Sequence, residues 1–132
     1  MSSYMRKQPP RPTDAELEIL TVLWSLGPSS VRAVHEAINR RRPAQYSTVL
    51  KFLQIMAEKG LVRRDEKDRA HIYQAARPRE WTQRQLAGDL LQRAFNGSAK
   101  SLMMGALSAR KASKAELAEL RRLLEKYEEG AS

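Results

Sequence analysis

The polar residues at helical spacing between positions 45 and 54 have the side chains that nucleic-acid recognition requires. They are Gln45, Tyr46, Ser47, Thr48, Lys51 and Gln54. The hydroxyl groups of Ser47 and Thr48 can bind phosphate oxygens or base edges, and Lys51 follows one turn later with a cation that can reach phosphate or guanine. The same two hydroxyls could instead only cap a helix. We expect this segment to be the part of the chain that reads DNA.

Arginine residues on both sides of this segment are suited to binding phosphate. One run is Arg40, Arg41 and Arg42, and a second group is Arg63, Arg64 and Arg69. Cations of this kind hold the DNA backbone without reading its sequence. The acidic residues Asp65, Glu66 and Asp68 interrupt the second group, so a solvated surface with internal ion pairs is the alternative. We expect backbone contacts from Arg41 and Arg42 in the first run and from the second group.

Hydrophobic periodicity predicts the elements that would position these side chains. The helices are expected from a Thr13 cap to Gly27, over 31–41 and over 46–59, and extended segments over 61–64 and 70–75. Three helices followed by a hairpin is the layout of a winged helix. We therefore place a winged helix-turn-helix DNA-binding domain at residues 13–78, after a flexible basic arm at residues 1–12.

The remainder of the chain, residues 79–132, is predicted to be entirely helical. Helices are expected over 79–95, over 99–108 and from a Ser113 cap to about residue 129. The apolar residues of these helices are Leu86, Leu90, Leu102, Leu117, Leu120, Leu124 and Tyr127. Their spacing in the last helix is close to that of a coiled coil, which predicts a dimer interface. The alternative is that they pack on the other helices of the same chain. The fold class is thus mainly α, with a small β-hairpin wing and a three-helix dimerisation domain.

Composition limits the partners that this chain can have. The 132 residues include 24 Lys and Arg against 15 Asp and Glu, a net charge of +9, which favours polyanions such as DNA. Residues 1–78 carry 14 basic and 8 acidic residues, and residues 79–132 carry 10 and 7. No apolar run approaches the ~20 residues that span a bilayer. The first twelve residues lack the apolar region of a signal peptide. We expect a cytoplasmic protein.

Residue types that support catalysis or metal binding are scarce. There is no cysteine, which excludes disulfides, thiolate metal sites and cysteine nucleophiles. His35 and His71 are the two imidazoles, and both are expected to be packing or surface groups. No Gly-rich phosphate loop, His-Glu metal pair or nucleophile elbow is present. We expect neither an enzyme nor a bound cofactor.

Two other classes of DNA-binding protein remain open on these observations. One is a non-specific architectural protein, which would share the charge but show no preference for an operator. The other is a winged-helix regulator that binds a small inducer. Such a pocket could be lined by Trp24, Trp81, Met56, Met103 and Met104, although these side chains at helical spacing are more often core.

The ordered set of short motifs between Thr13 and Tyr73 resembles the penicillinase-repressor (BlaI/MecI/CopY) family. The motifs are Leu17-Glu18-Ile19-Leu20 through Leu23-Trp24, Val31-Arg32-Ala33-Val34, Tyr46-Ser47-Thr48-Val49, Lys59-Gly60-Leu61-Val62 and Arg69-Ala70-His71-Ile72-Tyr73. The resemblance extends through the helical remainder to about residue 128. It implies a homodimer that represses a promoter by occupying a palindromic operator. It also implies release when a membrane-bound sensor protease cuts the fifth helix.

The chain departs from the family pattern at three places. Antibiotic-responsive members are cut at an Asn-Phe bond, whereas the corresponding stretch here is Met104-Gly105-Ala106-Leu107, so this stretch is a possible cleavage region only. Copper-responsive members carry cysteine metal motifs, which this chain lacks. Leu50 and Ile55 stand where better-studied members have basic residues, so the operator sequence does not transfer.

Overall fold

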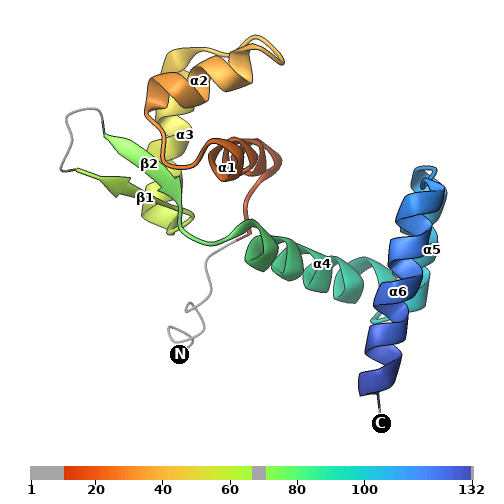
Figure 1. Ribbon diagram of the computed structural model, residues 1–132. Helices are drawn as coiled ribbons and strands as arrows, with labels where there is room; N and C mark the ends of the chain where they lie inside the picture. The colour runs from red at the N-terminus through yellow and green to blue at the C-terminus, as the bar shows by residue number, and fades with distance from the viewer. Residues whose placement is uncertain (1–10, 67–70, 132) are drawn as a thin grey trace, which may run out of the picture. The chain divides into compact units, whose positions relative to one another are not determined.

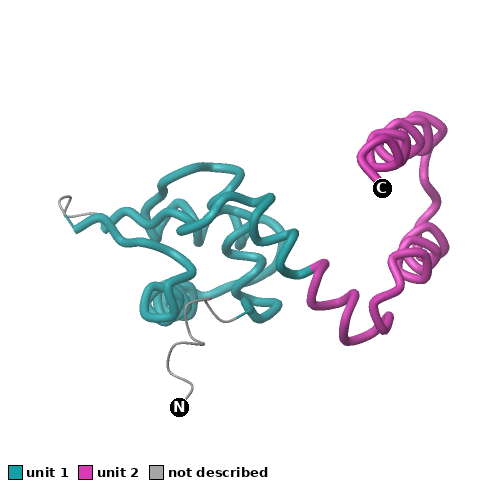
Figure 2. Tube along the Cα trace, turned by 90° about the horizontal axis from the view of Figure 1, so that it is seen from below, with its two compact units in different colours: residues 1–86 teal, residues 87–132 magenta. Residues whose placement is uncertain are grey.

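The computed structural model describes residues 11–66 and 71–131. The chain divides into two compact units, residues 1–86 and 87–132 (Figure 2). Most of the predicted N-terminal arm lies outside the described residues, and so does Arg69. The domain boundary that we place after residue 78 stays a prediction.

The first unit contains three helices followed by a two-stranded antiparallel hairpin (Figure 1). The elements are α1 (Asp14–Leu26), α2 (Val31–Asn39), α3 (Tyr46–Lys59), β1 (Val62–Asp65) and β2 (Ile72–Ala75). The strands pair from Val62 with Ala75 to Asp65 with Ile72. This arrangement confirms the predicted fold class, a mainly helical protein with a small hairpin wing.

The ends of these helices follow from local sequence. The predicted Thr13 cap forms a capping box: the Thr13 hydroxyl accepts from the backbone N–H of Glu16, and the Glu16 carboxylate accepts from that of Thr13. Gly27 and Gly60, each at φ +83°, allow the chain to leave α1 and α3 in a backbone conformation that other residues rarely adopt.

The core of the first unit joins all three helices to the wing. Its fully buried members include Leu23 of α1, Val34 of α2, and Leu53 and Met56 of α3. Tyr73 of β2 is also buried, and its backbone exchanges two 2.8 Å hydrogen bonds with Ser29, just before α2. The wing is therefore fixed to the helices by both side-chain packing and backbone pairing, which fixes the base of the hairpin relative to α3.

Several boundaries differ from the sequence prediction by one or two residues, and two of them have a local cause. The second helix ends at Asn39 rather than Arg41, because the Arg41 and Arg42 N–H groups both bond the Ile38 carbonyl and tighten the chain into a turn. The second strand begins at Ile72, after His71 at φ +53°. A left-handed residue interrupts the extended backbone that strand pairing requires.

Helix α4 (Arg79–Phe95) begins in the first unit and continues into the second, which also contains α5 (Ala99–Ala109) and α6 (Lys114–Gly130). Among residues 87–131, no side chain is buried. The large apolar residues left exposed in this unit are Leu90, Met104, Leu107, Leu117, Leu123, Leu124 and Tyr127. Three helices with this much uncovered apolar surface lack a core of their own.

Candidate nucleic-acid interface

Helix α3 has one face in the core and one face in solvent. Val49, Leu53 and Met56 are buried on the inner face. The residues of the predicted reading segment are all exposed: Gln45, Tyr46, Ser47, Thr48, Lys51 and Gln54. Ser47, Thr48, Lys51 and Gln54 therefore share the outer face of α3, and Gln45 and Tyr46 lie at its start. An exposed polar face on a helix with a buried opposite face is the form that enters a major groove.

The start of α3 is held differently from the starts of other helices. A Thr or Ser hydroxyl caps α1, α2, α5 and α6, but Gln45 makes no side-chain cap bond at α3. Instead, α2 holds the preceding residue, Ala44: His35 Nε2 lies 2.7 Å from its carbonyl oxygen, and Asn39 Oδ1 accepts from its N–H at 3.0 Å. The sequence predicts only a packing or surface role for His35, because contacts across a turn leave no periodic signal.

The wing presents arginines near α3, but one of them is already paired. Arg63 and Arg64 are both exposed on β1. The Arg64 guanidinium donates to Glu66 at 2.7 Å, and hydrogen bonds with Glu66 and then Tyr73 raise the pKa of Arg64. The internal ion pair considered as an alternative for this hairpin is therefore present at Arg64. Arg63 lies opposite Gln74 in the hairpin.

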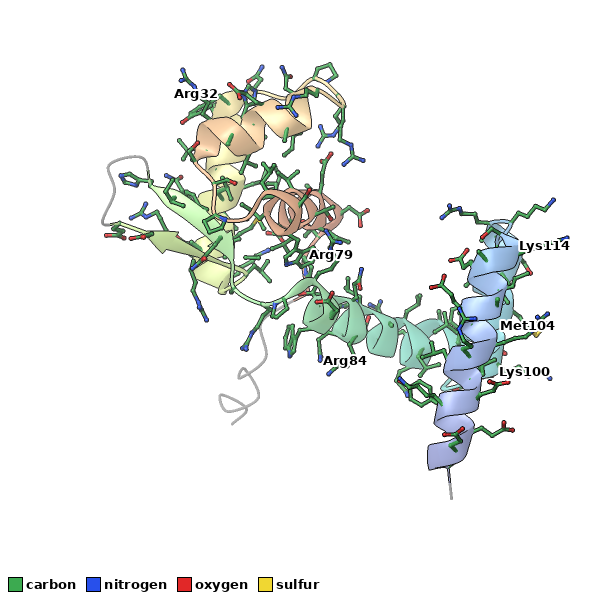
Figure 3. The ribbon with its side chains drawn as sticks, viewed as in Figure 1. Arg32, Arg79, Arg84, Lys100, Met104 and Lys114 are labelled. Atoms are coloured by element: carbon green, nitrogen blue, oxygen red, sulfur yellow. The ribbon has the colours of Figure 1, made fainter. Side chains whose placement is uncertain are left out.

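A groove runs between the start of α2, the outer face of α3 and the wing. Its volume is about 600 Å³. Its polar and charged lining includes Arg32, Tyr46, Gln54, Arg64 and His71. Arg32 is exposed and projects from α2 (Figure 3). These side chains come from three elements and carry donors suited to phosphate oxygens. Arg32 was not among the predicted site residues.

The arginine run after α2 lies beside the start of α3. All three residues, Arg40, Arg41 and Arg42, are exposed. Arg42 is engaged by Glu18 of α1, which accepts from both Nε and an Nη atom of its guanidinium. Hydrogen bonding to Glu18 raises the pKa of Arg42. Arg42 therefore has to give up this carboxylate before it can bind a phosphate through the same nitrogens.

The two tryptophans considered for an inducer pocket face arginines of the first unit. Trp24 Nε1–H donates to the Arg77 carbonyl oxygen at 2.9 Å, and the Arg79 guanidinium lies 5.9 Å from the Trp24 ring centre. Arg77 lies 4.8 Å over the Trp81 ring. Met56 belongs to the hydrophobic core. These contacts join α1 to the first turn of α4, where Arg79 lies (Figure 3).

The predicted cleavage region, Met104, Gly105 and Ala106, lies within α5 and is exposed. A Cβ added at Gly105 would lie 3.5 Å from the Phe95 ring, an ordinary contact distance. Among residues 11–66 and 71–131, no group of three His, Asp or Glu side chains could hold a metal ion. Within the same residues, no helix has the length and hydropathy to cross a bilayer.

Comparison with known proteins places these features in a family. Residues 12–126 match the penicillinase repressor family. Two curated relatives, both described as transcriptional regulator BlaI, come from Mycobacterium tuberculosis strains CDC 1551 / Oshkosh and ATCC 25618 / H37Rv. Each is 46% identical over 61 residues, which are 46% of this chain and 44% of the relative. The matched segment thus spans less than half of those relatives.

Proposed function

Because this chain belongs to the penicillinase repressor family, we propose that it is a transcriptional repressor that binds a palindromic DNA operator as a homodimer. In this proposal, α3 enters the major groove, and the wing and the arginine run contact the flanking backbone. The observation that carries it is the exposed polar face of α3 above a buried apolar face. The two Mycobacterium tuberculosis relatives are likewise described as transcriptional regulators.

The contacts expected in the complex with DNA are of two kinds, contacts to base edges and contacts to phosphate oxygens. Ser47, Thr48 and Lys51 lie on the first two turns of α3 and can reach base edges. Arg41, Arg63 and the groove lined by Arg32 are positioned for phosphate oxygens. Base contacts set the operator sequence, whereas phosphate contacts supply affinity that decreases with salt.

The apolar surface of α6 supports the homodimer. Leu124 and Tyr127 are 58% and 72% exposed, on a helix where no residue is buried. A second copy of the chain packed on this surface gives a two-fold symmetric dimer that matches the symmetry of a palindromic operator. Linking two half-site contacts in one dimer raises affinity well above that of either contact.

Release from DNA is proposed to follow an inducing signal, with proteolysis in α5 as one route. The helix is exposed at Met104, Gly105 and Ala106. A cut there would separate α6 and its apolar residues from the DNA-binding unit, so the two half-site contacts would no longer be linked. A membrane-bound sensor protease, or another signal, would start this release.

A non-specific architectural protein is the second candidate, and the net charge of +9 favours it equally. Selection of duplexes from a random pool, at physiological salt with competitor DNA, separates the two. We expect enrichment of a two-fold symmetric site with half-sites about one helical turn apart. Equal retention of all duplexes, fading as salt rises, would refute the repressor and leave the architectural protein.

A further inference from the structure

We propose that His35 and Asn39 of α2 are positioning residues that set the start of the reading helix, and that His35 thereby determines how strongly the protein prefers its operator to other DNA. This inference rests on the proposed function. It assigns a role in operator recognition to two residues of α2 that need not contact DNA themselves.

The contacts converge on Ala44, two residues before α3. His35 Nε2 lies 2.7 Å from the Ala44 carbonyl oxygen, and Asn39 Oδ1 accepts from the Ala44 N–H at 3.0 Å. The His35 ring also meets the Tyr46 ring edge to face, with centroids 5.8 Å apart. Both hydrogen-bonding groups of one peptide residue are thus held by the preceding helix, and the first residue of α3 is held by the same imidazole.

The chemistry of the His35 contact fixes which atom donates. A carbonyl oxygen has only lone pairs, so Nε2 must carry the hydrogen. His35 is partly buried, so water competes poorly for this bond. The α3 N-cap residue, Gln45, makes no side-chain cap bond, so loss of the His35 bond leaves Ala44 held by Asn39 without help from a cap.

The effect of these bonds on DNA recognition depends on how precisely each kind of DNA contact has to be positioned. A base-reading side chain has to be held within about 0.5 Å of its productive geometry. Ser47 and Thr48 are three and four residues after Ala44, so they move with it. Phosphate contacts are less demanding, because charge attraction falls off slowly with distance. Loosening Ala44 should therefore weaken operator binding more than binding to random DNA.

A pair of His35 variants tests this proposal. In His35→Gln, the amide nitrogen lies near the position of the imidazole Nε2. In His35→Asn, the amide nitrogen lies near the position of Nδ1, out of reach of the Ala44 oxygen. The full chain is compared as wild type, His35→Gln and His35→Asn. Affinity is measured for the selected operator duplex and for a random duplex of equal length at the same salt, together with thermal unfolding.

We expect His35→Asn to lower operator affinity on the order of fivefold, the size of one lost hydrogen bond. Its affinity for random DNA should change by less than about twofold, since phosphate contacts supply non-specific binding. His35→Gln should keep the wild-type ratio between the two duplexes. Asn39→Ala removes the second contact and should lower the same ratio, which keeps the test available if His35→Asn unfolds.

Three outcomes would overturn the inference. Equal ratios in wild type, His35→Asn and Asn39→Ala would mean that neither residue positions α3. A parallel loss on both duplexes with a lower unfolding temperature would mean that the role is only structural. A wild-type protein without any operator preference would refute the proposed function itself, and this result is distinct from the other two.

Discussion

The Lys59 ammonium group, in the last turn of α3, lies 2.7 Å from the carboxylate of Glu16 in the first turn of α1. Glu16 is only 2% exposed, and its other oxygen accepts from the Thr13 backbone. Burial raises the pKa of Glu16, but the hydrogen bond from Lys59, the bonds with Thr13 and the Lys59 charge outweigh it, so the pKa is lower than the ordinary value of 4.5. One carboxylate thus caps α1 and joins it to the last turn of α3.

Glu16→Gln should destabilise the protein in a pH-dependent way. Gln can keep the capping contact to Thr13 but loses the charge that pairs with Lys59. We expect a loss of about 1–2 kcal/mol in the free energy of unfolding at pH 7. The unfolded carboxylate takes up its proton at a higher pH than the folded one. The extra free energy of unfolding that the wild type has over Glu16→Gln is therefore fully present above about pH 5–6. It declines as the pH falls through 4.5 toward the pKa of Glu16 in the folded protein.

Urea unfolding at several pH values between 7 and 3 measures this advantage. Glu58→Gln, at an exposed position one residue from Lys59, is the matched control and should leave the curve unchanged. A difference between Glu16→Gln and wild type that stays constant across this range would show that the ion pair contributes nothing through its charge.

Substitutions on the outer face of α3 should separate base reading from backbone binding. Thr48→Ala is expected to weaken operator binding by about 1–3 kcal/mol if the hydroxyl reads a base, with little effect on random DNA. Lys51→Ala should weaken binding and lower the salt slope by about 1 if the ammonium group binds phosphate. Titrations of operator and random duplexes over a range of salt concentrations provide both values.

Glu58→Ala, on an exposed position of the same helix beyond these turns, is the control for general effects on α3. Unchanged operator affinity in both Thr48→Ala and Lys51→Ala would remove α3 as the reader, whatever the charge of the protein.

The arginine run should contribute unequally to DNA binding, because Glu18 already engages Arg42. Arg41→Gln is expected to lower the salt slope by about 1, whereas Arg42→Gln should change it by less. Glu18→Gln frees the Arg42 guanidinium and should strengthen binding to random DNA about twofold to threefold at low salt. The double variant Glu18→Gln, Arg42→Gln should lose this gain. Equal slopes for the two single arginine variants would show that Glu18 does not restrain Arg42.

The reading segment could be predicted because its signals are local. The bounds of α3, Tyr46–Lys59, were predicted correctly, since apolar residues recur at helical spacing and Gly60 ends the helix. The pairing of Glu18 with Arg42 spans 24 positions, and the bond from His35 to Ala44 crosses a turn. Such contacts depend on how α1 and α2 pack, which periodicity does not contain. The sequence therefore predicts which face of α3 is exposed, but not which arginine is already paired with a carboxylate.

The proposed dimer interface is best tested at a residue that is mostly exposed within its own unit. Leu120 lines a small groove with Met103 and Leu107 of α5, so an aspartate there could disrupt the chain itself as well as a dimer. Leu124 is 58% exposed, so Leu124→Asp costs little in the isolated chain but would bury a charge in a helix pair.

We expect the Leu124→Asp variant to sediment as a monomer and to bind a single half-site with unchanged affinity. The palindromic operator should bind it at least about a hundredfold more weakly than it binds the wild type. Arg122→Asp introduces the same carboxylate on the opposite side of α6 and should remain dimeric. A Leu124→Asp protein that still sediments as a dimer at micromolar concentration would place the interface on another surface.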